Sequence, residues 1–364
     1  MDRVKEIPFA IDRKAGRSLI EQIADGLRQE IVCGRYRPGD TLPSSRALEA
    51  ALGVSRIVVK AAFARLAAEG FTVPRPRVGT VVRDRGEKQW KGHVVLVGTD
   101  EDDNYLQSIL SGIVRDRLME AGYLLTRASI HTAPDGKPDF THLDVALARS
   151  VDLVVVLYGN AEILRHLARR KVPFAMLRET PESSAGAVGF THLDYNLAAS
   201  DFAAECVRLG VGEVVEAYWT NKLCDVADEC RKAGIKVTRM KIPVDFSEGH
   251  LVAVKRAGLD AFSRLASSGR LKRDAVYFIA DDYLASGALL ALTAVGVAIP
   301  GDVRLAVWSN VGLGPVFTKK LSRMELDPAE AGATVAAATL EYLKTGRYPS
   351  GGVVGSRWIP GETM

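Results

Sequence analysis

The sequence lacks the features of a membrane-spanning or secreted protein. It contains no apolar run long enough to cross a bilayer, and residues 1–6 do not lead into the apolar core of a signal peptide. Its four cysteines, Cys33, Cys206, Cys224 and Cys230, form no CxxC pair and have no zinc-type spacing with histidine. We therefore expect a cytoplasmic protein with buried free thiols. A redox pair of Cys224 and Cys230 is the weaker alternative, because disulfides are scarce in the cytosol.

Motifs of the common enzyme classes are also absent. No GxSxG, HExxH or phosphate-binding glycine loop occurs, and the six histidines are scattered along the chain. We therefore predict no enzymatic activity, no cofactor and no metal site. The tetrapeptide Thr-His-Leu-Asp occurs at both 141–144 and 191–194, but its residues suggest no shared chemistry.

Basic residues are concentrated at the N-terminal end. Residues 1–90 hold 17 Lys and Arg against 11 Asp and Glu, whereas the whole chain carries a net charge of only +4. The rest of the chain is therefore slightly acidic. This division favours a polyanion as partner of the N-terminal segment and a small molecule or protein as partner of the remainder.

The N-terminal segment predicts three helices and a hairpin. Apolar residues recur at three- and four-residue steps over 19–31, which indicates one buried helix face. Ser44 and Ser55 are good N-caps for two further short helices, and Gly53 between them supplies the turn. This arrangement predicts a helix-turn-helix. The β-prone stretches that follow flank a basic loop at 74–79 and predict a wing.

Residues 38–80 also carry a specific pattern. They read Pro-Gly, Leu-Pro-Ser-x-Arg-x-Leu, Leu-Gly-Val-Ser-Arg, Glu-Gly and finally Gly-Thr. From about residue 8 to 83 the chain thus resembles the winged helix of GntR-type bacterial transcription regulators. The resemblance implies DNA contacts by Arg46 and Arg56 and a wing tip at Gly79. An ordinary helical domain with a solvated basic surface is the alternative.

The chain departs from that family at residues that would read DNA. Lys60 replaces the usual arginine, which keeps the charge but loses the bidentate fork. Ile57 and Val58 stand where the family has hydroxyl residues, and Val78 belongs to a wing with fewer glycines. An apolar side chain can touch a thymine methyl but cannot hydrogen-bond, so we expect an altered base preference. The candidate DNA-binding residues are Ser44, Ser45, Arg46, Ser55, Arg56, Ile57, Lys60, Arg75, Arg77 and Gly79.

After a charged segment at 84–92, short apolar strands alternate with helix-like stretches. Continuous Val, Ile and Leu strands followed by helices predict parallel sheets covered on both faces. About ten such strands are too many for one sheet and predict two lobes. The predicted fold is α/β, with a winged helix-turn-helix at 1–83, a linker at 84–92, and a two-lobed ligand-sensing and dimerisation domain at 93–364.

Ligands of such sheets bind beyond the carboxyl ends of the strands. The residues there are carboxylates, amides, a guanidinium and aromatic rings, which suit a polyhydroxylated ligand with a CH face that stacks on rings. The candidate ligand-binding residues are Asp100, Tyr105, Tyr158, Arg178, Asp194, Trp219, Asp281, Asp282 and Trp308. Any one of them could equally be a helix cap or a surface residue.

Two segments of this region carry a second resemblance. Residues 275–288 read Ala-Val-Tyr-Phe-Ile-Ala-Asp-Asp-x-x-Ala-x-Gly-Ala, and Ile-Pro-x-Asp-Val follows at 299–303. These segments resemble the effector domain of LacI-type regulators, which is related to periplasmic sugar-binding proteins. The resemblance implies two lobes that exchange strands, with a sugar in the cleft between them. A GntR winged helix joined to such a sensor is similar to the bacterial arabinose-repressor arrangement.

Two departures leave the effector open. The segment 219–227 has no arginine where the family places one, and Trp308-Ser309-Asn310 replaces an aspartate of the family. The resemblances together imply a sequence-specific regulator, expected to be a repressor, that binds a palindromic operator as a homodimer under ligand control. One alternative is a sensor domain that has lost its ligand and only dimerises. Another is a fusion to an aminotransferase-like domain, for which the chain is too short and has no suitable pyridoxal-phosphate lysine.

Overall fold

The computed structural model describes residues 7, 9–14, 16–84, 90–99, 105–132, 137–157, 161–177, 186–194, 196–220, 226–246, 249–349 and 352–364.

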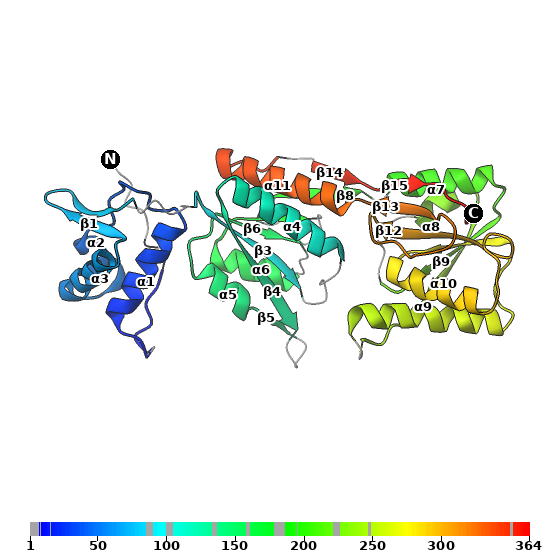
Figure 1. Cartoon of the computed structure of the whole chain (residues 1–364), viewed down its shortest axis with the longest axis horizontal. Coiled ribbons are helices and arrows are strands. Elements are labelled where there is room, and N and C mark those ends of the chain that lie inside the picture. The colour runs from blue at the N-terminus through cyan, green and yellow to red at the C-terminus, as the bar shows by residue number, and fades with distance from the viewer. Residues whose placement is uncertain are drawn as a thin grey trace. The chain divides into compact units, whose positions relative to one another are not determined.

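Capping residues set the ends of the N-terminal helices. The first three helices are α1 (Leu19–Val32), α2 (Ser45–Leu52) and α3 (Arg56–Ala68) (Figure 1). Ser44 caps α2 by accepting the Ala47 N–H at 3.2 Å, and Gly53 ends it in the left-handed conformation. Ser55 occupies the predicted N-cap of α3, but its side chain makes no capping hydrogen bond.

A two-stranded antiparallel sheet follows, as predicted for a wing. Its strands are β1 (Thr72–Arg75) and β2 (Gly79–Val82), with Arg75 opposite Gly79. The strands therefore reach closer to the tip than predicted, and Arg75 belongs to β1 rather than to the loop. Arg77, at the tip, has a positive φ of 66°. The three helices pack around a core that includes Ile23, Leu48 and Val59, all fully buried.

The described chain forms two compact units, each built from three separate segments. The first unit is Met1–Asp100, Val114–Phe190 and Ala336–Ser350, and the second is Glu101–Ile113, Thr191–Val335 and Gly351–Met364. The first unit thus contains both the winged helix and a sheet. The boundaries of the winged helix at residue 83 and of the linker at residue 92 remain predictions.

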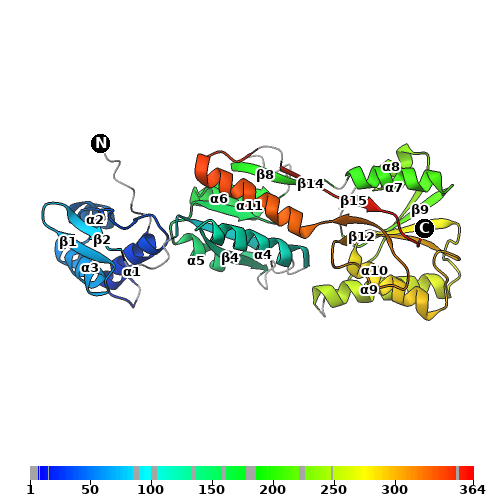
Figure 2. The same ribbon diagram turned by 45° about the horizontal axis from the view of Figure 1, so that its top comes forward.

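The first sheet has seven strands in the order β14-β8-β7-β6-β3-β4-β5. The strands are β3 (His93–Thr99), β4 (Leu124–Thr132), β5 (Pro138–Asp139), β6 (Leu153–Val156), β7 (Phe174–Leu177), β8 (Ala187–Asp194) and β14 (Gly352–Gly355). The helices around it are α4 (Tyr105–Glu120), α5 (Thr141–Leu147), α6 (Ala161–Arg170) and α11 (Pro328–Thr345). Apolar residues of α5 and α6 pack on one face of the sheet, and α4 and α11 lie side by side on the other (Figure 2).

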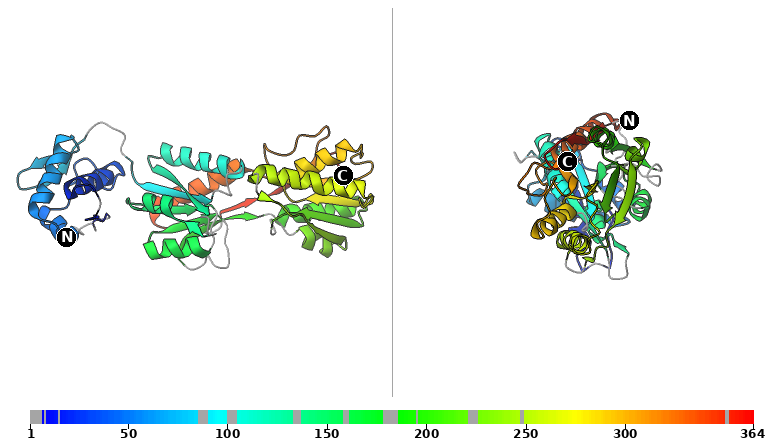
Figure 3. Two further views of the ribbon diagram at one scale, coloured as in Figure 1. Left: turned by 90° about the horizontal axis from the view of Figure 1, so that it is seen from below. Right: turned by 90° about the vertical axis from the view of Figure 1, so that its right-hand side faces the viewer.

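The second sheet has six strands in the order β10-β9-β11-β12-β13-β15. The strands are β9 (Glu213–Tyr218), β10 (Lys236–Lys241), β11 (Ala275–Ile279), β12 (Arg304–Asn310), β13 (Ser322–Leu326) and β15 (Arg357–Ile359). Its helices are α7 (Asn196–Arg208), α8 (Val226–Lys232), α9 (His250–Ser267) and α10 (Asp282–Ala294). Helices α9 and α10 cover one face, and α7 and α8 lie on the other (Figure 3).

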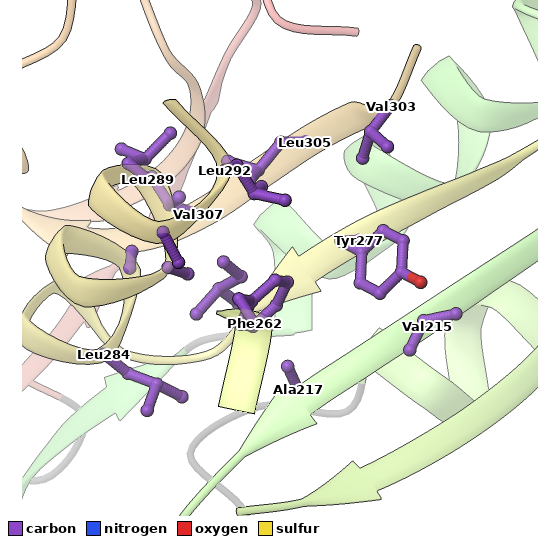
Figure 4. Packing of buried hydrophobic residues seen from close by; sticks show 14 of the residues in the cluster. Val215, Ala217, Phe262, Tyr277, Leu284, Leu289, Leu292, Val303, Leu305 and Val307 are labelled. Carbon is purple, nitrogen blue, oxygen red and sulfur yellow. The ribbon is translucent and has the colours of Figure 1, made fainter. Parts of the chain in front are cut away.

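The core beneath α9 and α10 is formed by alternate residues of the strands. Val215, Tyr277 and Leu305 come from three neighbouring strands and meet Phe262 of α9 (Figure 4). The Phe262 and Tyr277 rings pack edge to face with their centroids 5.6 Å apart. Both faces of β11 are buried, as the apolar sequence of this strand predicts.

Most of the predicted alternation is confirmed, but the short elements are missed. The prediction omits α5 and the strands β5, β13, β14 and β15. Strand β13 has no apolar run, because buried Met324 and Leu326 alternate with Arg323 and Glu325. The central strands are parallel as predicted, whereas β15 and β5 pair antiparallel at sheet edges. No described helix combines the length and apolar composition needed to cross a membrane.

The contact of α9 with α10 generates a first prediction. A Cβ placed on Gly287 of α10 would lie 1.9 Å from the carbonyl oxygen of Lys255, whereas Gly112 of α4 has no atom within 4 Å of that point. Gly287→Ala should lower the free energy of unfolding by about 1–3 kcal/mol through overpacking. Gly112→Ala should raise it by about 0.5–1 kcal/mol through helix propensity. Urea unfolding of both variants tests this, and a Gly287→Ala protein as stable as wild type would contradict it.

Candidate nucleic-acid interface and ligand site

Two groups of basic residues in the winged helix differ in their partners, and the first group is used inside the domain. The Arg65 guanidinium lies 3.2 Å from the Glu21 carboxylate and 3.0 Å from that of Glu69. Arg28 pairs with both Asp25 and Glu69. These ion pairs join α1 to the end of α3 and hold the two helices in register.

The second group consists of the five predicted DNA-contact cations. They are Arg46, Arg56, Lys60, Arg75 and Arg77. All five are exposed, and none forms an ion pair with any residue that the structure describes. They lie on α2, on the first two turns of α3, and on the wing. An exposed cation without an acidic neighbour retains its full capacity to bind phosphate.

The polar residues predicted beside these cations differ in availability. Ser44 is exposed, but its hydroxyl already accepts the capping hydrogen bond of α2. Ser45 is half-buried, whereas Ser55 is exposed and makes no capping bond. Gly79 has a φ of +120°, and a Cβ there would come within 3.1 Å of the Thr41 methyl group. The wing therefore adopts this backbone conformation more easily with glycine at position 79 than with a residue that carries a side chain.

The end of α1 makes contacts that the sequence did not predict. The Glu30 side chain is 1% exposed and accepts a hydrogen bond from the Ser150 N–H at 3.1 Å. Arg35 donates to the Ser150 hydroxyl at 2.9 Å. Burial raises the pKa of the Glu30 carboxyl. Any Cβ at Gly34 would overlap the carbonyl oxygen of Trp90, so only glycine fits there. These contacts attach α1 to later residues of the first unit.

A second candidate site lies at the carboxyl ends of β11 and β12. Asp282 follows β11 and is 3% exposed. Its carboxylate accepts hydrogen bonds at 3.3 Å from both the backbone N–H and the side-chain amide of Asn310. Burial and the neighbouring Asp281 raise the pKa of Asp282 to about 6. Asp281 itself caps α10 by accepting the Leu284 N–H at 2.8 Å.

The start of α4 lies against the same strand ends. The backbone of Tyr105 forms a hydrogen bond with the side chain of Tyr283. The hydroxyl of Tyr105 would be 2.6 Å from a Cβ placed on Gly312. Several buried polar atoms in this unit have no hydrogen-bond partner among the described residues. They include the hydroxyls of Ser111 and Ser309 and the side-chain oxygen of Asn310. A bound molecule or water is the usual partner of such groups.

The structure brings together only some of the predicted ligand contacts. Tyr105, Asp281 and Asp282 share one neighbourhood in the second unit. Trp219 follows the adjacent β9 and packs on Phe246, with ring centroids 5.6 Å apart. Trp308 lies inside β12 and is 5% exposed.

Of the remaining four predicted contacts, one belongs to the other sheet and three are not described. Asp194 ends β8 in the other sheet. Asp100, Tyr158 and Arg178 lie outside the described residues. The list of candidate contacts omits Asn310, although Asn310 lies at the end of a predicted strand, where the family has an aspartate. It also omits Ser111, which nothing in the sequence of α4 distinguishes.

The described residues include no group of three or more His, Cys, Asp or Glu arranged to hold a metal ion. Cys33, Cys206 and Cys230 are free and buried, as predicted, while Cys224 lies outside the described residues. Burial raises the pKa of the Cys33 thiol to about 11 and that of Cys230 to about 12, so both stay protonated at neutral pH.

Comparison with known proteins identifies both regions. Residues 19–82 match the model of bacterial regulatory proteins of the gntR family, and residues 215–364 match that of a periplasmic binding protein-like domain. The uncharacterized HTH-type transcriptional regulator YieP of Escherichia coli is 31% identical over 139 residues, which are 38% of this chain and 59% of YieP. The chain thus spans less than two thirds of that relative. It combines a GntR helix-turn-helix with a periplasmic-binding-protein-like α/β domain.

Solved structures agree on the fold. A LacI family transcriptional regulator from Arthrobacter sp. FB24, solved with lactose, is 20% identical with a TM-score of 0.59, over 75% of this chain and 98% of that one. The lac repressor dimer bound to operator and the anti-inducer ONPF is 14% identical with a TM-score of 0.60, over 77% and 96%. At these identities the similarity establishes the α/β architecture alone.

The buried carboxyl of Asp282 generates a second prediction. Its folded-state pKa of about 6 lies above the ordinary value of 3.8, so its contribution to stability is present at low pH and is lost as the pH rises through 6. Asp282→Asn should therefore gain stability relative to wild type, by about 1 kcal/mol, between about pH 5 and about pH 7.5. Urea unfolding at both pH values measures it. Asp201→Asn, at an exposed position of α7, is the control and should show no such gain.

Proposed function

We propose that this protein is a DNA-binding transcription regulator whose affinity for its operator is controlled by a small polyhydroxylated ligand. The observation that carries the proposal is the division of the winged-helix cations. Arg28 and Arg65 are used in internal ion pairs, while the five cations on α2, α3 and the wing are exposed and form no ion pair with a described residue. Residues 19–82 also match the gntR model, which supports the same function.

The DNA-reading part follows from where these cations lie. Helix α3 begins at Arg56 and has Lys60 one turn later, so its first turns present positive charge to a groove. Arg75 and Arg77 of the wing then meet the flanking backbone. A homodimer places two such helices in successive major grooves of a palindromic operator. The solved lac repressor dimer bound to operator supports this stoichiometry by its shared fold.

The ligand part rests on the carboxyl edge of β11 and β12. The buried groups there include two hydrogen-bond acceptors, the Asp282 carboxylate and the side-chain oxygen of Asn310, with the Tyr105 ring nearby. Acceptors pair with hydroxyl donors, and an aromatic ring suits the CH face of a sugar. The Arthrobacter regulator was solved with lactose, which supports a carbohydrate effector here. We infer that the regulator is a repressor and that the ligand and DNA affinities are reciprocally coupled.

The DNA-reading part is tested by removing one exposed cation. Arg56→Ala should weaken binding to duplexes selected by the wild-type protein by about tenfold or more and reduce the salt dependence of that binding. Arg270→Ala, which removes an exposed arginine of the second unit, should bind like wild type. Fluorescence anisotropy at several salt concentrations measures both, and an unchanged Arg56→Ala protein would refute the role of α3.

The ligand part is tested by thermal shift against a panel of neutral mono- and disaccharides. A sugar that binds the folded state must raise the melting temperature. If its hydroxyl donates to Asp282, it favours the carboxylate, so affinity should fall about tenfold per pH unit below about pH 6 and should be weakened by Asp282→Asn. No shift across the panel would favour a domain that only dimerises. Turnover of amino donors in the presence of pyridoxal phosphate would instead indicate an enzyme.

A further inference from the structure

The first turn of α3 exposes a large apolar side chain. Ile57 is 79% exposed, whereas Val58 is half-buried and Val59 is fully buried in the winged-helix core. Of three consecutive β-branched residues, only Ile57 therefore projects fully into solvent. It is also more exposed than Val78 and Val32, the next most exposed large apolar residues described in the winged helix.

The neighbours of Ile57 leave room for a close partner. On either side along the helix stand Arg56 and Lys60, both exposed and without ion pairs to described residues. The next positions on its own face, four and seven residues later, are Ala61 and Ala64, which have short side chains. Along the helix axis, Ile57 thus lies between two cations. The small side chains of Ala61 and Ala64 on the same face let a partner surface approach the helix backbone closely.

We infer that Ile57 contacts the C5 methyl group of a thymine in the major groove and makes a T·A pair at that position a determinant of operator specificity. This inference rests on the proposed function of α3 as the reading helix. The thymine methyl is the apolar feature of the major-groove edges, and the phosphates along the groove suit the two cations, which share one helix face four residues apart. The side chain of Ile57 cannot hydrogen-bond, so it discriminates by burying this methyl group.

DNA accounts for these observations better than a protein partner does. A protein surface that covered Ile57 would also have to present acidic groups to Arg56 and Lys60, because burying unpaired cations is unfavourable. A duplex supplies the anions and the methyl group in one surface. A contact with another protein is nevertheless one outcome of the experiment below.

The experiment removes only the methyl group. Duplexes are selected from a random pool with the full-length protein, and each thymine of the selected operator is then replaced in turn by deoxyuridine, which lacks the C5 methyl. Wild-type affinity should fall by about threefold to tenfold at one thymine per half-site. Ile57→Ala should bind the thymine operator more weakly by a similar factor and should not respond to the replacement.

A matched control separates this contact from a general loss of apolar surface. Val145→Ala removes a 65% exposed side chain of α5 and should keep both the wild-type affinity and the wild-type response to deoxyuridine. Wild-type binding that tolerates deoxyuridine at every position would overturn the inference, as would an Ile57→Ala protein that responds like wild type. A change in oligomeric state with an unaltered uracil response would assign Ile57 to a protein contact instead.

A failure of the proposed function would give a different experimental result from a failure of the methyl contact. If no sequence is enriched, or if Arg56→Ala binds the selected duplex as tightly as wild type, then α3 is not the reading helix, and the inference about Ile57 falls with it. If Arg56→Ala weakens binding while the thymine response is absent, the regulator function stands and only the methyl contact is wrong.

Discussion

The second unit depends on the burial of both faces of its central parallel strands. Because α9 and α10 cover one face and α7 and α8 the other, the side chains of β11 are committed to packing along its whole length. All five side chains of β11 are buried, so its first carboxylates come only after the strand has ended, at Asp281 and Asp282. That constraint places Asp282 and Asn310 together at one edge, and the same burial raises the pKa of the Asp282 carboxyl. Burial of the sheet thus accounts both for the packing of the strands and for the raised pKa of Asp282 at their ends.

In the winged helix, the distribution of acidic residues separates cations that form internal ion pairs from cations that stay exposed. Glu21, Asp25 and Glu69 lie on or beside α1 and the end of α3, where they pair with Arg28 and Arg65. Those pairs reinforce an apolar core that already fixes the helices. No described acidic side chain pairs with the cations at the start of α3 or on the wing, which stay exposed to an external anion. The cations that take no part in these internal ion pairs therefore form the exposed basic surface of the domain.

The sequence predicted those features that depend on neighbouring residues. Ser44 and Gly53 mark the ends of α2 through their own backbone and side-chain chemistry, and the apolar runs of β6 and β11 identify buried strands without reference to their partners. What remained unpredicted depends on residues far apart in the chain. Strand β15 exists because it pairs with β13, and the burial of Glu30 depends on Ser150, 120 residues away. No local pattern records such pairings.

The division of both units into separate segments has a consequence for synthesis. The winged helix is continuous and has all its strands and helices by residue 82, whereas the first sheet includes β14, at residues 352–355, and the second includes β15, at 357–359. Since a chain emerges from the ribosome N-terminus first, the DNA-reading helices can form while the sensor sheets still lack strands. A chain cut short before residue 336 would keep the winged helix but lack β14 and β15, so each sheet would be incomplete. If the protein functions as proposed above, DNA binding by such a chain would escape control by ligand.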